Sequence, residues 1–165
     1  MRIAILTISD AGARGERADG SGDAIAAWAA AHGHAVTARE LVADETARIV
    51  PRLASWCDDD AADLVLTTGG TGLSPRDVTP EATRAVLERD APGIAERLRA
   101  SAAARFPQSA LARGVAGVRA RTLIVNLPGS PGGVADYLAA LEAIVEHAVA
   151  IVRGGAAEHG TGEGR

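Results

Sequence analysis

Short apolar segments of strand length recur along this 165-residue chain, and each is followed by a polar turn and then a helical pattern. The clearest are Ile3–Ile8, Leu64–Leu66 and Leu123–Val125. Near-continuous apolar strands are typical of parallel sheets whose faces are covered by helices. Because aromatic residues make up only 2% of the chain, the core must be built from Leu, Ile, Val and Ala, which favours helices packed closely on a sheet. The pattern predicts an α/β fold.

Weaker patterns complete the predicted set of elements. A further strand fits Ala35–Val42, and Val115–Arg119 is predicted to pair with Thr122–Asn126 as an antiparallel edge. Pro51 lies inside the predicted helix Asp44–Cys57 and should kink that helix or delay its start. We expect one domain over residues 1–153 and a disordered tail over 154–165, which has no apolar periodicity. The predicted helices are Ser21–Ala31, Asp44–Cys57, Pro80–Arg89, Ile94–Arg105 and Pro131–Val152.

The composition excludes several classes of function. All 17 basic residues are Arg, so the lysine of a Walker A phosphate loop and Schiff-base chemistry are both excluded. The net charge of -4 argues against a nucleic-acid binder, and the single Cys57 is too little for a thiolate zinc site or an iron–sulfur cluster. No apolar run approaches the ~20 residues that span a bilayer, and the first residues do not resemble a signal peptide. We therefore expect a cytoplasmic protein without a membrane segment.

The most informative segment is TTGGTGLSPRDVTPEAT, which runs from Thr67 to Thr83. Three glycines follow a predicted buried strand in this segment, and because glycine has no Cβ they allow a ligand to approach backbone N–H groups closely. Thr79 suits a helix N-cap and Pro80 the first helical position, so the end of a helix dipole favours an anion nearby. Taken alone, such a turn does no more than reverse the chain about as often as it binds a ligand.

An acidic residue within this segment changes the interpretation. A carboxylate beside a phosphate cradle is unfavourable unless a divalent cation lies between them, so Asp77 indicates Mg²⁺. The alternative is that Asp77 caps the loop or forms a salt bridge with Arg76 or Arg84. Asp44, at the end of the second strand, is the next acidic candidate, although Asp directly before a helix is a common N-cap.

Two other loops are predicted to follow strands at the same edge of the sheet. In NLPGSPGG, residues 126–133, Ser130 suits an N-cap and Pro131 the first helical position, which could bind a second anion or simply cap a helix. The long segment 7–25 is polar and contains glycine, and loops of this length are more often functional than idle, with mobility as the alternative. Loops at the carboxyl ends of parallel strands can converge on one cleft.

The segment TTGGTGLSPRDVTPEAT, together with the upstream SD…DGSG residues and the downstream NLPGSP, resembles the MogA/MoaB family of molybdenum-cofactor biosynthesis. The likeness runs from about Arg2 to Arg153. It implies a three-layer molybdopterin-binding fold, with helices on both faces of a mostly parallel sheet, and a homotrimer. The implied reaction moves AMP from Mg-ATP to the terminal phosphate of molybdopterin and releases pyrophosphate. The implied partners are molybdopterin, ATP and the molybdenum-insertion protein, which carries the same motif in a longer chain.

The resemblance also implies roles for individual residues. Asp44 and Asp77 fall on the family's functional acids, and we expect them to be catalytic and to hold Mg²⁺. Arg76 is expected to steady negative charge. The predicted substrate-binding residues are Ser9, Asp10, Asp19, Ser21, Gly22, Thr68, Gly69, Gly70, Thr71, Gly72, Arg76, Asn126, Pro128, Gly129 and Ser130.

Two alternatives belong to other functional classes. A non-catalytic molybdopterin-binding or scaffold protein would keep the fold and the phosphate loops without turnover. A nucleotide-binding oxidoreductase is disfavoured, because no G-x-G-x-x-G follows any predicted strand. The apolar face of Pro131–Val152 is wide enough to cover a partner subunit as well as a sheet, which agrees with the implied trimer.

Overall fold

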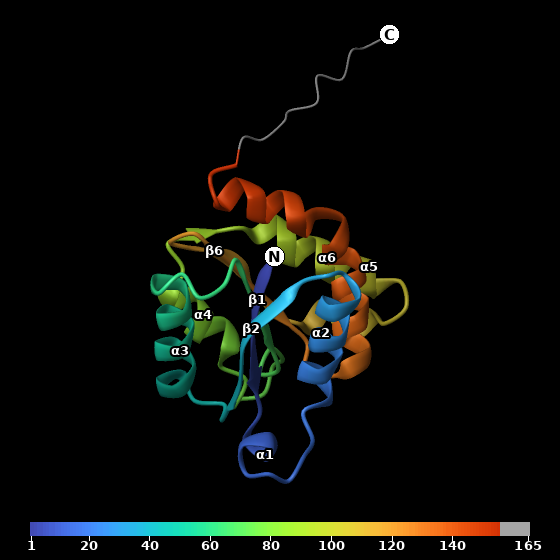
Figure 1. The fold of residues 1–165 in the computed structure, drawn as a ribbon. Helices are drawn as coiled ribbons and strands as arrows, with labels where there is room; N and C mark the ends of the chain where they lie inside the picture. Colours follow the sequence, from blue (N-terminus) through green and yellow to red (C-terminus); the bar gives the residue numbers. More distant parts are fainter. Residues whose placement is uncertain (156–165) are drawn as a thin grey trace.

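A computed structural model describes residues 1–155 of the chain. Its centre is a six-stranded sheet in the order β2-β1-β3-β6-β5-β4 (Figure 1). β1 pairs in parallel with β2 and β3, and β3 pairs in parallel with β6. β5 is antiparallel to both β4 and β6. The strands are β1 Arg2–Ile8, β2 Ala35–Val42, β3 Leu64–Thr68, β4 Arg89–Asp90, β5 Ala116–Arg119 and β6 Thr122–Leu127.

Helices cover both faces of this sheet, which confirms the predicted three-layer α/β architecture. α2, α5 and α6 lie on one face, and α3 and α4 lie on the other (Figure 1). No helix within residues 1–155 is long and apolar enough to cross a membrane. The helices are α1 Asp10–Ala13, α2 Gly20–Ala31, α3 Thr46–Asp58, α4 Thr79–Val86, α5 Pro92–Ala103 and α6 Pro131–Val152, with a 3-10 helix η1 at Pro107–Leu111.

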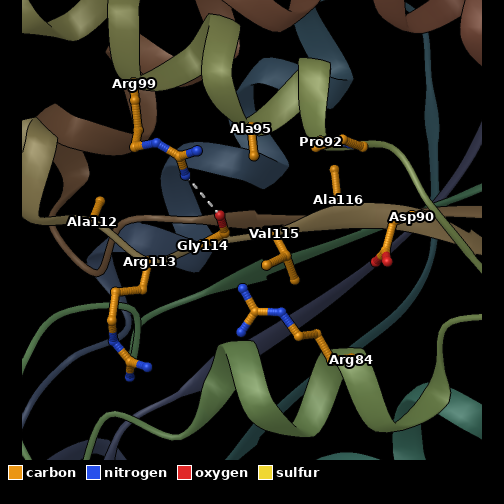
Figure 2. A pocket seen from close by; sticks show the side chains of 10 residues that line it. All are labelled: Arg84, Asp90, Pro92, Ala95, Arg99, Ala112, Arg113, Gly114, Val115 and Ala116. Carbon is orange, nitrogen blue, oxygen red and sulfur yellow. Dashed lines mark hydrogen bonds between the residues drawn. The ribbon is translucent and has the colours of Figure 1, made fainter.

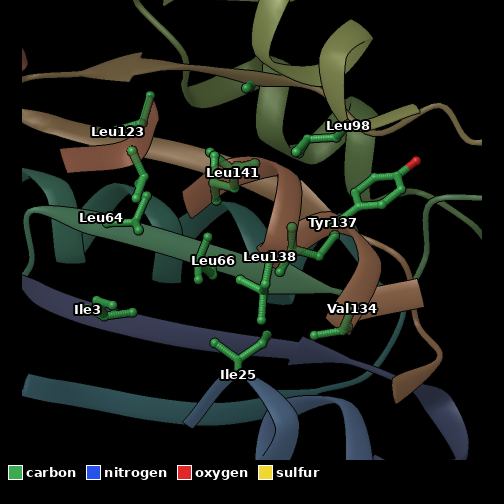
Figure 3. Close-up of a cluster of buried hydrophobic side chains, with 14 of the residues drawn as sticks. Ile3, Ile25, Leu64, Leu66, Leu98, Leu123, Val134, Tyr137, Leu138 and Leu141 are labelled. Carbon is green, nitrogen blue, oxygen red and sulfur yellow. The ribbon is translucent and has the colours of Figure 1, made fainter. Parts of the chain in front are cut away.

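The strands are apolar on both sides because each face contributes to a separate core. In β1, Ile3 and Ile5 belong to the core beneath α2, α5 and α6, whereas Ala4 and Leu6 face α3 and α4. This follows from the two-residue period of a strand. Figure 3 shows Leu64 and Leu66 of β3 beside side chains of α6. Burial on both faces explains why the sequence shows continuous apolar runs instead of alternation.

Several predicted boundaries differ from the structure. α3 begins at Thr46 instead of Asp44 and continues through Pro51. α4 ends at Val86 instead of Arg89, because Arg89 and Asp90 form β4 and pair with β5. β5, which was predicted to form the edge of the sheet, is therefore not the edge strand, because β4 pairs with its outer side. The predicted disordered tail lies outside the described residues, apart from Gly154 and Gly155.

The strand order creates one crevice at the carboxyl edge of the sheet. From β1 the chain passes to β2 on one side, and then to β3 on the other side. Loops that leave β1 and β3 therefore diverge toward opposite faces. Open α/β sheets bind ligands at such a switch point, so the loops after β1 and β3 are the first place to look for a site.

Candidate functional site

Three strand exits are in direct contact at this crevice. A Cβ built on Gly69, after β3, would lie 2.1 Å from the carbonyl oxygen of Ile8 at the end of β1. A Cβ on Gly129, after β6, would lie 3.1 Å from the Cα of Gly69. The Thr68 hydroxyl donates a 2.6 Å hydrogen bond to the Pro128 carbonyl, which ties the last two exits together. The structure thus brings the three predicted loops to one place.

The glycine loop, defined here as residues 69–77, begins with two left-handed residues. Gly69 has φ +96° and Gly70 has φ +63°, a region that favours glycine. The Thr79 hydroxyl donates to the Gly69 carbonyl at 2.8 Å, and the Thr79 N–H donates to Gly70 at 3.1 Å. The prediction that Thr79 caps α4 was wrong: Thr79 is the first helical residue, and Val78 precedes it. Its side chain instead fixes the loop.

Arg113, which sequence reasoning missed, holds the same loop through hydrogen bonds to its carbonyl groups. Its Nε donates to the Gly72 carbonyl at 2.7 Å and its guanidinium donates to the Asp77 carbonyl at 2.6 Å. Its backbone N–H donates to Thr71 at 2.8 Å, and it forms an ion pair with Glu81. These contacts join segments about 40 residues apart in the chain, and no local pattern around Arg113 indicates them.

A cleft of about 460 Å³ opens between the three exits. Arg17 also lines it and forms no ion pair or hydrogen bond within residues 1–155, so its charge is available to a ligand. Sequence reasoning did not select Arg17, since no motif includes it. The predicted residues that line the cleft are Ser9, Asp19, Ser21, Asp44, Gly69, Gly70, Asp77, Gly129 and Ser130.

Asp44, which lines the cleft, and its neighbour Asp10 have opposite electrostatic environments. Asp10 and Asp44 accept each other's backbone N–H groups, at 3.0 Å from Asp44 and 2.7 Å from Asp10. The Asp10 carboxylate also accepts both arms of Arg76 at 2.9 Å, which lowers the pKa of Asp10. Burial, with Asp10 and Asp77 nearby, raises the pKa of Asp44. Asp44 is not the N-cap of α3, because Glu45 holds that position. The negative charge of Asp44 is therefore compensated less than that of Asp10, which is paired with Arg76.

Asp77 forms neither of the salt bridges considered above. Its Oδ2 accepts the Ser74 N–H at 2.8 Å, so it does cap its own turn. Asp44 and Asp77 are close enough for repulsion between them to contribute to the raised pKa of Asp44. Within residues 1–155, no three or more ligating side chains are arranged to hold a metal ion. A cation here would complete its shell with phosphate or water oxygens, as Mg²⁺ commonly does, so the donor set fits Mg²⁺ with a phosphate ligand.

The PGS loop, defined here as Pro128–Ser130, lies beside the glycine loop and lines the cleft with Gly129 and Ser130. Ser130 is the N-cap of α6 and accepts the Gly133 N–H at 3.1 Å, with Pro131 in the first turn, as predicted. Asp19 has a comparable role at α2, where it accepts the Gly22 N–H at 2.9 Å and pairs with Arg39 at 2.6 Å. Both residues stabilise helix ends and line the cleft as well.

Some predicted substrate-binding residues do not line the cleft. Asn126 is buried, and its amide donates to Thr67 and Thr83 at 2.9 Å while its oxygen accepts the Val115 N–H at 3.1 Å. Its polar atoms are thus all used inside the protein. Arg76 is committed to Asp10. The others outside the lining are Asp10, Gly22, Thr68, Thr71, Gly72 and Pro128.

A second pocket of about 440 Å³ lies on the far side of the PGS loop. It shares Ser130 with the cleft and includes the predicted residues Thr71, Gly72 and Pro128. Its wall contains Phe106, whose side chain is 56% exposed, and Tyr137. Burial raises the pKa of the Tyr137 hydroxyl, which has no hydrogen-bond partner among the described residues. The PGS loop therefore separates an acidic compartment from one with aromatic walls.

Comparison with known proteins identifies the family. The family model described as "Probable molybdopterin binding domain" matches residues 4–147. The chain belongs to the molybdopterin-binding domain family. This member is 36% identical over 156 residues to a molybdopterin adenylyltransferase of Helicobacter pylori, a match covering 93% of this chain and 89% of the relative. It is 38% identical over 143 residues to the Escherichia coli molybdopterin adenylyltransferase, covering 84% and 72% of the two chains.

Solved structures of the family share the fold. The molybdopterin biosynthesis enzyme MoaB from Thermus thermophilus superposes with a TM-score of 0.88 at 51% identity, covering 93% of this chain and 96% of that one. The molybdopterin biosynthesis Mog protein from Mycobacterium ulcerans gives 0.86 at 41% identity, covering 91% and 97%. The resemblance to the MogA/MoaB family is thereby confirmed.

Proposed function

We propose that this protein is a molybdopterin adenylyltransferase, which moves AMP from Mg-ATP to the terminal phosphate of molybdopterin. The observation that carries the proposal is the meeting of two dissimilar compartments at Ser130. Two phosphorylated molecules that react with each other need adjacent sites and a shared point of phosphate contact. Relatives named molybdopterin adenylyltransferase, at 36–38% identity over most of the chain, support the same reaction.

The two compartments suit different substrates. The cleft with Asp44, Asp77 and Arg17 suits the triphosphate of a nucleotide with its magnesium. The pocket beside Phe106 and Tyr137 suits a flat ring with polar edges, because aromatic walls stack on such rings. We therefore assign ATP to the cleft and the pterin to the second pocket, with the pterin phosphate directed at the PGS loop.

The reaction needs positioning more than acid–base chemistry. A monoester phosphate has a second pKa of about 6 and is already largely ionised near neutral pH. One of its oxygens forms a bond to the α-phosphorus of ATP, the bond from that phosphorus to the bridging oxygen breaks, and pyrophosphate leaves with the electron pair. Bringing two polyanions into line is the main obstacle, and fixed positive charge and dipoles lower it.

The chain's own residues supply that positioning. Asp44 and Asp77 would hold Mg²⁺, which supplies charge neutralisation of the triphosphate oxygens when bound. The Gly70 backbone lines the cleft without a Cβ atom, so its N–H can approach a phosphate closely, whereas the Gly69 N–H already donates to the Leu127 carbonyl at 3.3 Å. Arg17 adds a mobile positive charge, and the N-terminus of α6 at Ser130 favours the pterin phosphate.

The direct test is nucleotide chemistry on the full chain. Purified protein is incubated with molybdopterin, ATP and Mg²⁺, and adenylylated molybdopterin and pyrophosphate are quantified. Equimolar formation of both is expected. Molybdopterin binding without ATP consumption would instead select the non-catalytic scaffold, and the absence of both binding and turnover by folded protein would reject the proposal.

Replacement of one acid separates catalysis from binding. Asp77→Asn keeps the shape of the side chain and removes its charge, so turnover should fall at least about 100-fold while molybdopterin binding changes little. Asp59→Asn is the matched control, since Asp59 is exposed and its side chain forms no hydrogen bond or ion pair among the described residues. Full activity of Asp77→Asn would contradict the role of Asp77 as a metal ligand.

The remaining implied properties are proposals as well. We propose a cytoplasmic homotrimer that delivers its product to the molybdenum-insertion protein. Mass in solution tests the trimer, and a pull-down with the purified insertion protein tests the partnership.

A further inference from the structure

A third pocket, of about 490 Å³, includes no residue of the PGS loop, shares no lining residue with the cleft and shares only Ala112 with the second pocket. It opens between α4, α5 and the segment that leads into β5 (Figure 2). Arg84 of α4, Arg99 of α5 and Arg113 line it from three separate segments. The reaction proposed above makes no use of Arg84 or Arg99, so this pocket needs a separate explanation.

Two of these arginines have no carboxylate partner. Most arginines of this chain do form ion pairs, for example Arg119 with Asp58 at 2.7 Å. Arg99, in contrast, donates only to the Gly114 carbonyl at 2.9 Å, and Arg84 makes no hydrogen bond or ion pair within residues 1–155. In Figure 2 the two guanidinium groups extend from opposite walls toward Gly114 and Val115. Their positive charges therefore face one space, although Glu81, which precedes Arg84 in α4 and is ion-paired with Arg113, partly offsets the charge of Arg84.

The other charged groups at this pocket are arranged differently. The Arg113 guanidinium turns away from the pocket (Figure 2) and is occupied by Gly72, Asp77 and Glu81. Asp90 lies at the opposite end from Arg113, beside Pro92 (Figure 2), and forms no ion pair within the described residues. The region between Arg84 and Arg99 is thus positive, with one negative charge at its far end.

The floor between the charges is apolar. Pro92 is exposed and Val115 is half-buried, and both line the pocket, whereas Ala95 and Ala116 are almost fully covered, at 8% and 2% exposed. A bare inorganic ion would leave this surface uncovered. A ligand with an anionic head and a small apolar body would use both parts of the pocket.

We propose that this pocket binds the phosphate group of a small, partly apolar phosphate ester, held between Arg84 and Arg99. A single guanidinium fork saturates the two oxygens of a carboxylate, whereas a phosphate has three terminal oxygens and accepts two forks from opposite sides. The apolar body of the ester lies on Pro92 and Val115. The site is separate from the adenylyl transfer and does not depend on it.

Calorimetric titration at constant ionic strength, without Mg²⁺, tests the proposal on the full chain. The probes are inorganic phosphate and phenyl phosphate, a small ester with an apolar ring. Phenyl phosphate should bind more tightly than phosphate, and Arg84→Gln should weaken its binding about tenfold, the effect of losing one charged hydrogen-bonding group. Equal affinity for the two probes would overturn the ester assignment.

Three control variants show where the probe binds. Arg89→Gln removes an equal charge from neighbouring β4, outside the lining, and should change the affinity less than twofold. Asp90→Asn should tighten binding, because it removes the one negative charge at the pocket. If Arg89→Gln weakens binding as much as Arg84→Gln, attraction is diffuse and the site is rejected. If only Arg17→Gln weakens it, the probe lies in the cleft and the proposal is again rejected.

The Arg84 variant also distinguishes a ligand site from a subunit interface. Arg84 is exposed and forms no hydrogen bond or ion pair within residues 1–155, so Arg84→Gln should largely keep the thermal stability and the solution mass of the parent protein. A change in mass would mean that another copy covers the pocket, which would overturn the proposal.

Discussion

The glycine loop and the PGS loop follow neighbouring parallel strands and lie side by side at one cleft, yet they keep their shapes in different ways. The glycine loop begins with two residues in the left-handed region, and distant side chains, Thr79 and Arg113, hold its carbonyl groups. The PGS loop has no residue with positive φ and ends in a helix cap made by its own Ser130. Side chains from outside the loop hold several carbonyl groups of the glycine loop, whereas the PGS loop receives one such bond, from Thr68 to Pro128, and ends in its own helix cap.

The largest expected effect follows from adding one methyl group to the glycine loop. Gly69→Ala would place a Cβ 2.1 Å from the Ile8 carbonyl, at a φ of +96°. The left-handed conformation alone costs about 1–2 kcal/mol, and the backbone of β1 or of the loop must also move. We expect the free energy of unfolding to fall by about 3 kcal/mol or more, measured by urea denaturation.

The matched substitution in the PGS loop should be much milder. Gly129→Ala would meet the Gly69 Cα at 3.1 Å, without a positive φ, so a small shift relieves the contact. A loss of about 1 kcal/mol is expected. Equal losses for the two variants would mean that the loops are not held differently, and the comparison would fail.

An effect of similar size is expected at the cap of α6. Ser130→Ala removes the hydrogen bond to the Gly133 N–H, so the free energy of unfolding should fall by about 1 kcal/mol. Ser130→Asn restores a capping oxygen and should recover that stability. If Ser130 also contacts the pterin phosphate, both variants should weaken molybdopterin binding, as measured by fluorescence titration. Recovery of both properties in Ser130→Asn would reduce Ser130 to a cap.

The same contrast explains which parts of the molecule were predictable from the sequence. α6 was predicted with both of its boundaries, and β2 likewise, because caps, prolines and apolar periodicity are local. β4 was missed, since its two residues form a strand only by pairing with β5, almost 30 positions further along. Strand pairing of this kind leaves no periodic pattern in so short a segment.

Site residues follow the same rule. The sequence indicated which loops meet, because strand order and turn composition are enough for that. It did not indicate which polar side chains are already occupied. Asn126 and Arg76 appeared suited to a ligand but bind Thr83 and Asp10 instead, while Arg17 and Arg113 belonged to no motif. Such pairings depend on contacts between distant segments.

The smallest expected change concerns Asp44, which lies against the glycine loop: a Cβ on Gly70 would be 2.9 Å from its Oδ1. Burial raises the pKa of Asp44 in the folded protein, so ionisation favours the unfolded chain. Asp44→Asn should therefore unfold at a slightly higher temperature than the parent protein near neutral pH. The difference should grow as the pH rises from 3.8 through the raised pKa, and disappear below 3.8. It should stay smaller than the loss in Ser130→Ala, since the side chain is partly exposed.

Adding Mg²⁺ tests whether Asp44 is a metal ligand or only a partly buried carboxylate with a raised pKa. If Asp44 and Asp77 hold Mg²⁺, adding MgCl₂ with a non-hydrolysable ATP analogue should raise the melting temperature of the parent protein, because the ligand binds only the folded state. The same addition should have little effect on Asp44→Asn. Calorimetric melting with Asp59→Asn as the control measures both. An equal rise in all three proteins would show that Asp44 does not hold Mg²⁺ and would overturn the proposed metal site of Asp44 and Asp77.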